Sequence, residues 1–404
     1  MAAVKRILIL DTGNEWGGGT NSLFEYLKRA DRDQYHFTAL FYKNYKKSGS
    51  SDLKTEFQKL GIDFILIPQA PNTFFLKSLK EAVRMLFFYN KKLLKRVIFF
   101  LEYHLKINKK AGKIAEILIT SKSDLLYMNN QPSSNLEGIL ASRNTGIPAV
   151  QHCRIESELN KTETTLANTH LKKIMTVSEG VKNSLVRQGI DANKCIVVYN
   201  GIDAAAQPEK DLRFIRKELG AEENTVLIGT VCSLIKRKRV KDLLDAFASV
   251  LKTATQPIKC VIVGEGPEGE TLQRYAEKLN ISEHTIFTGF KSDAVSYINA
   301  FDIFILTSRK EGLPRVILEA MLMGKPVVAS DVTGPAELVL SGSTGYLVGL
   351  GQTKEFAGAI TALVRDSGLR AKMGGAARQR VVEKFDINSY VKGIEKTFSE
   401  ALKK

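Results

Sequence analysis

Short apolar runs alternate with longer polar stretches along most of the chain. The first series of runs is RILIL, FTALFY, FILIP, DLLYM, AVQHC and IMTVS. After CIVVYNGID the rhythm restarts with VLIGTVC, KCVIVGEG, TIFTGF, DIFILTS and KPVVAS. Continuous apolar runs separated by helical stretches are typical of parallel strands that are buried on both faces. Two such series predict an α/β protein with two doubly wound, Rossmann-like domains.

The periodicity is lost in GIDAAAQPEKD, so we place the domain boundary there. The expected domains are residues 1–203 and 204–384. The last stretch, INSYVKGIEKTFSEALKK, predicts a terminal helix, and we expect residues 385–404 to pack back on the N-terminal domain. Ligands of open α/β sheets lie beyond the carboxyl ends of the strands. Two such domains facing each other therefore predict a ligand cleft between them.

The stretch EGLPRVILEAMLMGKP sets two glutamates, Glu311 and Glu319, eight positions apart in an apolar surrounding. Pro314 can open a helix, because its missing N–H would be unpaired in the first turn anyway, and Gly324 can close it. Only Arg315 and Glu319 make a polar line on this helix, at i,i+4 spacing. The residues alone leave two interpretations: an ion pair beside a solvated loop glutamate, or a binding site built on two carboxylates.

Two glycine-rich turns follow predicted strands. Three consecutive glycines come after the first strand and precede a helix that we expect Thr20 or Asn21 to cap: Gly17, Gly18 and Gly19. Glycines there let a ligand approach the backbone, and a helix N-terminus favours anions, although a tight turn also explains them.

The second turn, GEGPEG, satisfies the GxGxxG pattern with Gly264, Gly266 and Gly269. It follows the second strand of its domain, whereas the dinucleotide fingerprint belongs to the first βα turn, so we do not expect a nicotinamide or flavin site. The DRD at residues 31–33 follows a helix end, and we expect a solvated turn there rather than a metal site.

Basic residues and one histidine complete the candidate chemistry. His152 ends a strand of the first domain, where a lone histidine is more often structural than catalytic. After VLIGTVC, five cations crowd a predicted helix start, where they could neutralise a diphosphate or form a solvated face: Lys236, Arg237, Lys238, Arg239 and Lys241.

Composition narrows the class of protein. The 404 residues are 44% hydrophobic and 25% charged, as in ordinary globular proteins. The apolar run in MAAVKRILILD is too short for the hydrophobic core of a signal peptide. No run of 18 apolar residues exists either, so we expect a cytoplasmic protein without membrane spans. Four cysteines lie far apart in strand-like runs and predict reduced, buried thiols: Cys153, Cys195, Cys232 and Cys260.

The net charge of +16 is concentrated in one segment, residues 77–113. Eleven Lys and Arg stand there against Glu81 and Glu102, a local balance of +9, interleaved with aromatic and aliphatic residues. We expect a helical insertion of the first domain that meets an anionic membrane surface or a lipid-linked phosphate. A core helix with one solvated basic face explains the pattern nearly as well.

Taken together, VYNGID, VGEGPEG, FTGF and SRKEGLPRVILEAMLMGKPVVASDVTGPAELV resemble the GT4 family of retaining glycosyltransferases, which have the GT-B fold. The resemblance is dense from about Cys195 to Leu363 and weaker through the glycine loop and His152. It carries implied roles. Glu319 would hold the ribose of a nucleotide sugar, and Glu311 would face the sugar ring and its developing positive charge.

The resemblance also implies the surroundings of the donor. The amides of Gly312 and Leu313 would lie near the sugar and phosphate, and Gly264 belongs to the same donor-binding side. Gly289 and Phe290 would border the base. From the other domain His152 would reach the outer hydroxyls of the sugar, and the turn of Gly17, Gly18 and Gly19 would let the acceptor come close.

The implied mechanism needs no metal, no cofactor besides the nucleotide-sugar co-substrate, and no enzyme nucleophile. The acceptor hydroxyl attacks from the face that the diphosphate leaves, and the leaving phosphate helps to take its proton. Lys238 matches the phosphate-binding Lys of the family, but Ser233 stands where the family carries Arg. Loss of such a contact costs about 1.5–3 kcal/mol unless Lys236 or Arg237 replaces it.

We therefore expect a retaining, metal-independent glycosyltransferase that uses a UDP- or GDP-sugar and a glycan or lipid-linked acceptor. Its setting would be cell-surface polysaccharide or lipopolysaccharide synthesis of a bacterial type, in the cytoplasm or on the inner face of the plasma membrane. A GT-B epimerase or phosphorylase is the alternative. A nucleic-acid-binding protein is suggested only by the pI of 9.5, and the charge lies in one segment without a recognised motif. The sugar, base, acceptor, linkage and oligomeric state stay undetermined.

Overall fold

The computed structural model describes residues 3–13, 16–46, 51–67 and 74–403, with side chains omitted for residues 74–77. The chain divides into two compact units. Unit 1 comprises the residues up to Thr176, Lys182–Val197 and the residues from Ile394 on, and unit 2 comprises Val177–Val181 and Val198–Gly393. Each unit is built around its own parallel sheet, as the two series of apolar runs predict.

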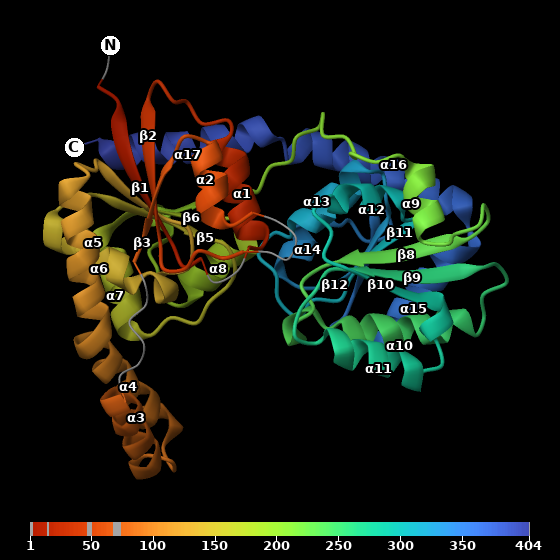
Figure 1. The fold of residues 1–404 in the computed structure, drawn as a ribbon, viewed down its shortest axis with the longest axis horizontal. Helices are drawn as coiled ribbons and strands as arrows, with labels where there is room; N and C mark the ends of the chain where they lie inside the picture. Colours follow the sequence, from red (N-terminus) through yellow and green to blue (C-terminus); the bar gives the residue numbers. More distant parts are fainter. Residues whose placement is uncertain (1–2, 14–15, 47–50, 68–73, 404) are drawn as a thin grey trace. The chain divides into compact units, whose positions relative to one another are not determined.

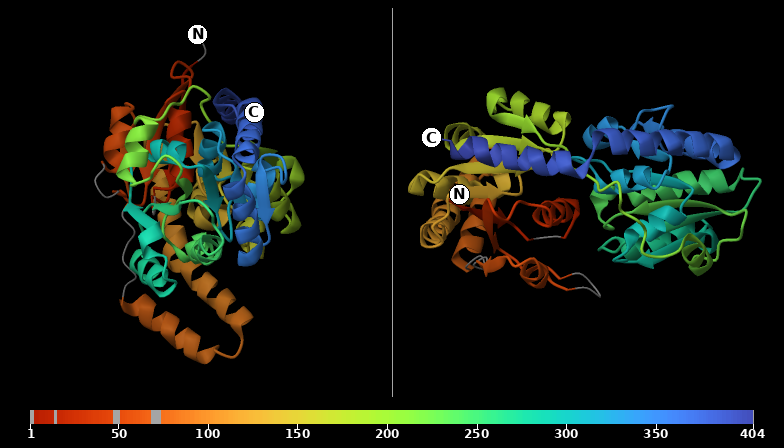
Figure 2. Two further views of the ribbon diagram at one scale, coloured as in Figure 1. Left: turned by 90° about the vertical axis from the view of Figure 1, so that its right-hand side faces the viewer. Right: turned by 90° about the horizontal axis from the view of Figure 1, so that it is seen from above.

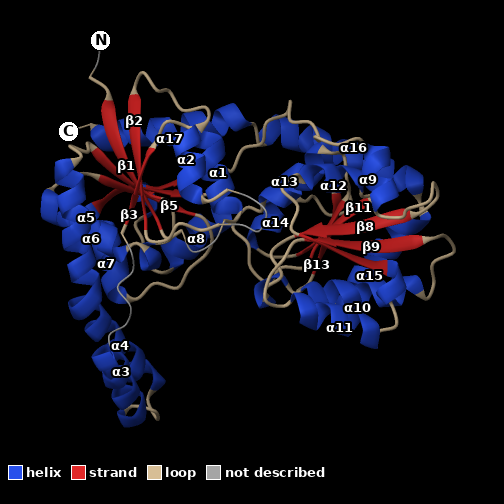
Figure 3. Cartoon of the chain, viewed as in Figure 1, coloured by secondary structure: helices blue, strands red, loops and turns tan. Residues whose placement is uncertain are grey.

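Unit 1 contains a seven-stranded parallel sheet in the order β3-β2-β1-β4-β5-β6-β7. The order turns back at β1, which pairs with both β2 and β4. The side chains of its central strands are almost wholly buried because helices cover both faces (Figures 1 and 3). The strands are β1 (Lys5–Asp11), β2 (Tyr35–Phe41), β3 (Asp63–Leu66), β4 (Leu125–Met128), β5 (Ala149–Cys153), β6 (Leu171–Thr176) and β7 (Cys195–Val197).

Eight helices connect these strands among the described residues. They are α1 (Gly18–Leu27), α2 (Leu53–Lys59), α3 (Phe74–Leu86), α4 (Lys91–Glu102), α5 (Asn108–Thr120), α6 (Leu136–Thr145), α7 (Lys161–His170) and α8 (Glu179–Arg187). A single π-helical turn, Tyr103–Ile107, joins α4 to α5. The predicted helical insertion is therefore present, as α3, α4 and the start of α5.

Unit 2 contains a six-stranded parallel sheet in the order β10-β9-β8-β11-β12-β13. Its strands are β8 (Val226–Val231), β9 (Ile258–Val263), β10 (Thr285–Gly289), β11 (Ile303–Leu306), β12 (Val327–Ser330) and β13 (Gly345–Val348). The apolar runs predict all of these except β13. That edge strand has only four residues and begins with a glycine at φ +152°, so its sequence, GYLV, gives little strand signal.

The helices of unit 2 lie on both faces of this sheet. Figure 3 shows α10, α11 and α15 on one side and α9, α12 and α13 on the other. They are α9 (Leu212–Glu218), α10 (Val240–Leu251), α11 (Gly269–Lys278), α12 (Ala294–Ala300), α13 (Arg315–Leu322), α14 (Thr333–Leu338), α15 (Thr353–Arg365) and α16 (Ser367–Lys384). No helix of the described ranges is both long and apolar enough to cross a bilayer.

The predicted terminal helix is α17 (Ile387–Leu402), and its residues divide between the two units at Gly393. In unit 1, the ring of Phe398 lies 5.1 Å from that of Tyr127 and about equally close to Tyr26 and Tyr35, at 6.0 and 5.8 Å. The Glu395 carboxylate accepts a hydrogen bond from the backbone N–H of residue 31 at 3.1 Å. The end of the chain is therefore part of the core of unit 1.

Two local expectations are wrong. Helix α1 begins at Gly18 with Gly17 as its N-cap, so Thr20 and Asn21 lie inside its first turn and do not cap it. The strand β8 ends at Val231, so Cys232 follows the strand and is only half-buried, whereas the other three cysteines are buried in strands. All four thiols are free, as expected.

Candidate active site

At the carboxyl edge of the sheet in unit 2, two loops pack backbone against backbone. A Cβ atom on Gly264 would lie 1.9 Å from the carbonyl oxygen of Cys232, and one on Gly266 would lie 2.5 Å from that of Leu234. Both glycines have positive φ, +138° and +158°. Gly264 and Gly266 are thus required by the contact between the β9–α11 and β8–α10 loops, whereas a Cβ on Gly269 would make only an ordinary 3.7 Å contact with Leu234. The loop contact therefore explains two of the three glycines of the GxGxxG pattern without a dinucleotide.

The basic stretch after β8 forms a 3₁₀ turn, Lys236–Lys238, followed by Arg239 in the left-handed region at φ +50°. The next loop along the edge fixes this turn. Thr307 donates from its hydroxyl to the carbonyl oxygens of Lys238 and Arg239, both at 3.0 Å. The backbone N–H of Arg309 donates to the carbonyl of Arg237 at 2.8 Å. The β8–α10 and β11–α13 loops are therefore held in register.

This register places two cations on one buried carboxylate. The Lys238 Nζ lies 2.6 Å from Glu311 Oε1, and a guanidinium nitrogen of Arg237 lies 3.6 Å from Oε2. Glu311 is only 7% exposed. Burial alone would raise the pKa of Glu311, but the charges of Lys238 and Arg237 outweigh it and hold the pKa below its ordinary value. Glu311 is therefore an ionised carboxylate at neutral pH.

Ser233 stands where the resembled family carries a phosphate-binding arginine, so we compare the positions of the two nearby cations, Lys236 and Arg237. Ser233 is exposed, and so is Lys236, which forms no ion pair with any residue of the described ranges. Arg237 instead lies at the same carboxylate as Lys238 and also donates to the carbonyl of Lys310 at 2.8 Å. Of Lys236 and Arg237, only Arg237 lies beside Lys238 at the Glu311 carboxylate among the described residues.

Helix α13 begins one residue later than predicted, at Arg315, with Pro314 as its N-cap. It ends in a Schellman motif. The N–H of Gly324, at φ +64°, donates to the carbonyl of Met321, and the N–H of Lys325 donates to that of Ala320. These bonds satisfy carbonyls that the helix end would leave unpaired.

The second glutamate lies within this helix. Arg315 Nε is 3.7 Å from Glu319 Oε1, and the guanidinium of Arg315 also donates to the carbonyl of Gly201 at 3.1 Å. The i,i+4 ion pair considered from the sequence is thus present. Gly312 and Leu313 precede the helix and are buried. The Leu313 carbonyl accepts a bond from the Asn200 side chain at 2.8 Å, which ties the VYNGID loop to this segment.

The β10 end belongs to the same edge. Gly289 has φ +70°, and its carbonyl accepts a 2.9 Å bond from the N–H of Gly264. Phe290 follows and is half-buried. The edge of unit 2 thus includes nine of the predicted site residues: Ser233, Lys238, Gly264, Gly289, Phe290, Glu311, Gly312, Leu313 and Glu319.

The carboxyl edge of the sheet in unit 1 carries the other predicted residues, and one of them, His152, belongs to a buried polar network. His152 in β5 is fully buried, and its Nδ1 lies 2.9 Å from the hydroxyl of Tyr127. Arg154 donates to the Asn129 side-chain oxygen at 2.8 and 2.6 Å and to the Tyr127 hydroxyl at 3.3 Å. Asn129 in turn donates to Asp11 at 2.7 Å. Burial and then the charge of Arg154 lower the pKa of His152 far below its ordinary value, so the imidazole is neutral.

The three glycines lie beside this network, at the start of α1. A Cβ on Gly18 would meet nothing within 4 Å, and one on Gly19 would lie 3.4 Å from the side chain of Arg154. Gly17 is the N-cap and has extended backbone. Among these three glycines Gly18 is therefore uncrowded, whereas neighbouring backbone fills the space in front of Gly264 and Gly266.

Sequence reasoning missed four residues of this network: Asp11, Tyr127, Asn129 and Arg154. Each stands at or next to the carboxyl end of a predicted strand, in ILILD, DLLYMNN and AVQHCR. Polar residues at successive strand ends were the signal that could have found them.

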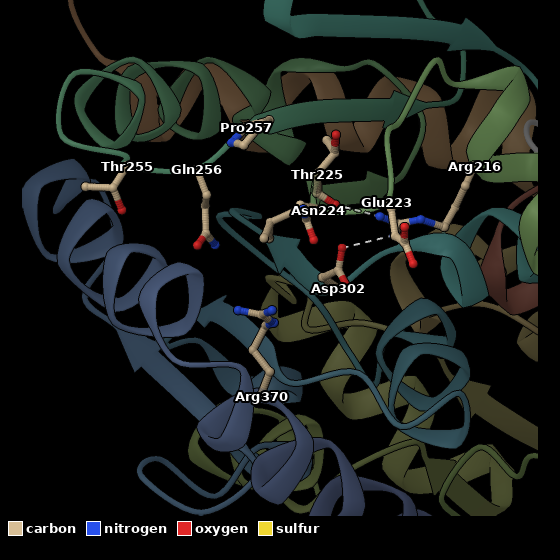
Figure 4. A pocket seen from close by; sticks show the side chains of 10 residues that line it. Arg216, Glu223, Asn224, Thr225, Thr255, Gln256, Pro257, Asp302 and Arg370 are labelled. Atoms are coloured by element: carbon tan, nitrogen blue, oxygen red, sulfur yellow. Dashed lines mark hydrogen bonds and ion pairs between the residues drawn. The ribbon is translucent and has the colours of Figure 1, made fainter.

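The opposite, amino edge of the sheet in unit 2 contains a hollow of about 460 Å³ (Figure 4). Its polar groups are engaged by the chain. Arg216 pairs with Asp302 at 3.1 Å, and Arg370 and Gln256 donate to backbone carbonyls at 2.6 Å. This hollow lies between the starts of β8, β9 and β11 and neighbouring segments. Among the described residues that line it, no carboxylate contacts two cations as Glu311 does.

Two family models match the chain and together cover most of both units. "Glycosyltransferase Family 4" matches residues 50–206, and "Glycosyl transferases group 1" matches residues 211–380.

Relatives and solved structures agree with these matches. N-acetyl-alpha-D-glucosaminyl L-malate synthase of Bacillus anthracis is 28% identical over 306 residues, 72% of this chain and 79% of that protein. UDP-Gal:alpha-D-GlcNAc-diphosphoundecaprenol alpha-1,3-galactosyltransferase of Escherichia coli is 27% identical over 299 residues, 70% and 76% of the two chains. The Anabaena protein Alr3699/HepE, solved with UDP-glucose, superimposes with a TM-score of 0.77 at 24% identity over 98% of this chain and 99% of that one. The chain therefore belongs to glycosyltransferase family 4 and has the GT-B fold.

Proposed function

We propose that this glycosyltransferase moves a sugar from a UDP- or GDP-sugar to a glycan or lipid-linked acceptor, with retention and without a metal ion. The observation that carries the proposal is the cluster of Lys238, Arg237 and Glu311 at the carboxyl edge of unit 2. Two cations share one carboxylate, so the cluster keeps a net positive charge at a strand edge where ligands of such sheets bind.

This excess charge suits a diphosphate. Phosphate oxygens accept charge-assisted hydrogen bonds from Lys and Arg, and Arg237 presents the forked donor that fits them best. As the donor reacts, the bond from C1 to the phosphate oxygen breaks and negative charge gathers on the leaving diphosphate. Lys238 and Arg237 would stabilise this charge more in the transition state than before it.

Glu311 has the complementary role. Its ionised carboxylate would face the positive charge that develops on the sugar ring as the leaving group departs. The acceptor hydroxyl then forms the new bond to C1 from the side that the phosphate leaves, and its proton passes to a phosphate oxygen. The products are a glycoside of unchanged anomeric configuration and the nucleoside diphosphate.

The remaining predicted residues complete the donor site in the proposal. Glu319 holds the ribose hydroxyls, with Arg315 orienting its carboxylate, and Gly289 and Phe290 border the base. His152, neutral and held by Tyr127, contacts the outer hydroxyls of the sugar, and the space above Gly18 admits the acceptor.

The relatives suggest the substrate class. The Anabaena protein was solved with UDP and with UDP-glucose, and the name of the Escherichia coli relative specifies UDP-Gal and a diphosphoundecaprenol acceptor. Another relative, CapM of Staphylococcus aureus, is named for capsular polysaccharide biosynthesis. We therefore propose a uridine nucleotide first and a lipid-linked or polysaccharide acceptor. The segment 77–113 would hold the enzyme at the inner face of the plasma membrane.

Nucleotide binding tests this proposal without knowledge of the acceptor. Thermal unfolding is measured with UDP, GDP, ADP and NAD, each with and without magnesium. At a hundredfold excess over its dissociation constant a true ligand adds about 2.7 kcal/mol of stability. We expect UDP or GDP to stabilise the chain without magnesium, and Glu319→Ala to abolish the effect.

The control variant is Glu355→Ala, which removes an exposed glutamate from α15 and should leave nucleotide binding intact. Stabilisation by NAD alone would contradict the proposal and would indicate that GEGPEG binds a dinucleotide after all. Turnover of a nucleotide sugar with no acceptor present would favour the epimerase alternative.

A further inference from the structure

The helical insertion of unit 1 ends in an exposed apolar turn. Four large side chains at the end of α3 and in the turn that follows it are 65–74% exposed: Met85, Leu86, Phe88 and Tyr89. We call residues 85–89 the hairpin tip. In Figures 1 and 2 the α3–α4 hairpin extends away from the strands of unit 1. None of the twelve residues of α4 is buried: Leu94, Val97, Ile98 and Phe99 are half-buried, and Leu93 and Phe100 are exposed.

Cations surround this tip. The first six residues of α4 include four exposed ones: Lys91, Lys92, Lys95 and Arg96. We call these four the basic collar. Within the described part of the chain no acidic side chain pairs with them, because Glu81 pairs with Arg84 and Glu102 pairs with Lys80. The apolar tip is therefore followed directly by uncompensated positive charge.

The hairpin is fixed at its base and closed along its length. Asn90 caps α4 by accepting a bond from the N–H of Leu93 at 3.0 Å. The pair of Lys80 and Glu102 joins the two helices at the far end from the tip. Beyond the π-helical turn, α5 packs on unit 1 through its buried side chains, Ala111, Ile114 and Leu118. Since α4 has twelve residues, the tip stands roughly 18 Å from the base.

We propose that the α3–α4 hairpin inserts its tip into an anionic bilayer while the basic collar binds the lipid headgroups. An aromatic and aliphatic tip beside Lys and Arg is the composition of interfacial membrane anchors, whose apolar side enters the headgroup boundary by about 5–10 Å. Helices of 13 and 12 residues are too short to span a bilayer.

Charge argues for lipid over a second copy of this chain. Two hairpins meeting tip to tip would bring the same segment, with its balance of +9, against itself. An anionic bilayer instead supplies negative charge over a whole plane. The inference names the part of residues 77–113 that would contact the membrane, and it rests on the proposed function only for the choice of membrane. Vesicle binding itself requires neither the sugar donor nor the acceptor.

Flotation with vesicles tests the electrostatic half. The full chain should bind phosphatidylcholine vesicles that contain phosphatidylglycerol, bind pure phosphatidylcholine weakly, and dissociate at high salt. Changing the basic collar to glutamine should lower partitioning roughly a hundredfold or more. The matched control changes four exposed lysines of unit 2 to glutamine and should lower it far less: Lys252, Lys278, Lys354 and Lys384.

Depth-dependent fluorescence tests insertion. The chain has one tryptophan, so a Trp16→Phe background permits a single probe at Phe88→Trp. Its emission should shift to the blue on vesicles and be quenched by brominated acyl chains. Phe214→Trp is the matched control, because Phe214 is 59% exposed on α9 of unit 2 and should stay unquenched.

Several outcomes would overturn the inference. Equal binding to neutral and anionic vesicles would remove the role of the basic collar, as would binding that survives the collar variant. Vesicle binding without quenching of the probe at residue 88 would remove insertion. A concentration-dependent dimer that Phe88→Ser abolishes, with no vesicle binding, would show that a second copy covers the tip. In each case UDP binding would be unaffected, so the proposed glycosyl transfer would stand or fall separately.

Discussion

Each of the two sheets places a buried carboxylate at its carboxyl edge, Asp11 in unit 1 and Glu311 in unit 2. Their exposed fractions are similar, 4% and 7%. Burial raises the pKa of Asp11 above its ordinary value, and the hydrogen bonds from Asn129 and from the N–H of Gly13, together with the charge of Arg154, offset this rise only in part. Glu311 contacts two cations and has a lowered pKa. At similar burial, direct contact with two cations lowers the pKa of Glu311, whereas the partners of Asp11 do not overcome the effect of burial.

The glycine turns at the two edges differ in the same way. In unit 2 the backbone of a neighbouring loop fills the space in front of Gly264, whereas in unit 1 a Cβ on Gly18 would meet no side chain or neighbouring loop of the described residues within 4 Å. The turn at Gly264 is required by packing, whereas the turn at Gly18 is exposed and is not crowded by neighbouring segments of the described residues. A glycine pattern alone does not distinguish these two uses.

The largest effect should come from Glu311→Gln. Removing the carboxylate leaves Lys238 and Arg237 partly buried without an opposing charge, and we expect a loss of about 3–5 kcal/mol in the free energy of unfolding at neutral pH. The folded pKa lies below the ordinary value of 4.5, so this stabilisation is complete above that pH and is lost as the pH falls below it.

Asp11→Asn sharpens the comparison, since its pH dependence should have the opposite sign. The folded pKa of Asp11 lies above 3.8, so wild type loses stability relative to the variant as the pH rises through that region. Urea unfolding between about pH 3.5 and pH 6 measures both differences. Parallel pH curves for the two variants would contradict the contrast between the edges.

A smaller effect is expected from Lys238→Ala on nucleotide affinity. Loss of one charge-assisted contact to phosphate costs about 1.5–3 kcal/mol, or roughly 10- to 150-fold in the dissociation constant of UDP. Calorimetric titration measures it. Lys236→Ala is the matched control, because that side chain is exposed and two residues away, and it should change affinity little. Equal losses would mean that only the general positive charge of the loop matters.

The smallest effect compares the glycines. Gly264→Ala should destabilise the chain by about 1–3 kcal/mol, since the new methyl group meets a carbonyl oxygen and φ is +138°. Gly18→Ala should leave unfolding unchanged or slightly stabilised, because alanine favours a helix and meets no atom. Thermal unfolding of both variants measures the difference. A larger loss of stability in Gly18→Ala than in Gly264→Ala would contradict the contrast between the two glycine turns.

Much of the fold follows from local pattern. Runs such as VLIGTV and IFIL are continuous, apolar and bounded by polar residues, and each is a strand. GYLV was missed because four residues at a sheet edge carry too little of this pattern. The start of α1 was misplaced because Gly18 and Gly19 have low helix propensity, and here the chain around them imposes the helix.

The candidate site was predictable as a set of positions but not as a set of contacts. The resemblance identified Glu311 and Lys238, 73 residues apart, but their 2.6 Å contact depends on how Thr307 and Arg309 bind the neighbouring loop. Similarly, His152 could be named from its strand end, whereas its neutral state depends on its burial and on the nearby charge of Arg154, which the strand pattern does not give. Ionisation is a property of the packed structure.

Helix α17 delays the completion of unit 1 during synthesis at the ribosome, because it is made last. The last strand of unit 1 ends at Val197, yet the aromatic pocket of Tyr26, Tyr35 and Tyr127 is filled by Phe398, about 200 residues later. At about 5–20 residues per second, unit 1 would wait roughly 10–40 s with that pocket uncovered. During this interval the three tyrosine rings lack the phenylalanine that packs against them in the finished protein, so unit 1 can complete its aromatic core only after the whole of unit 2 has been synthesised.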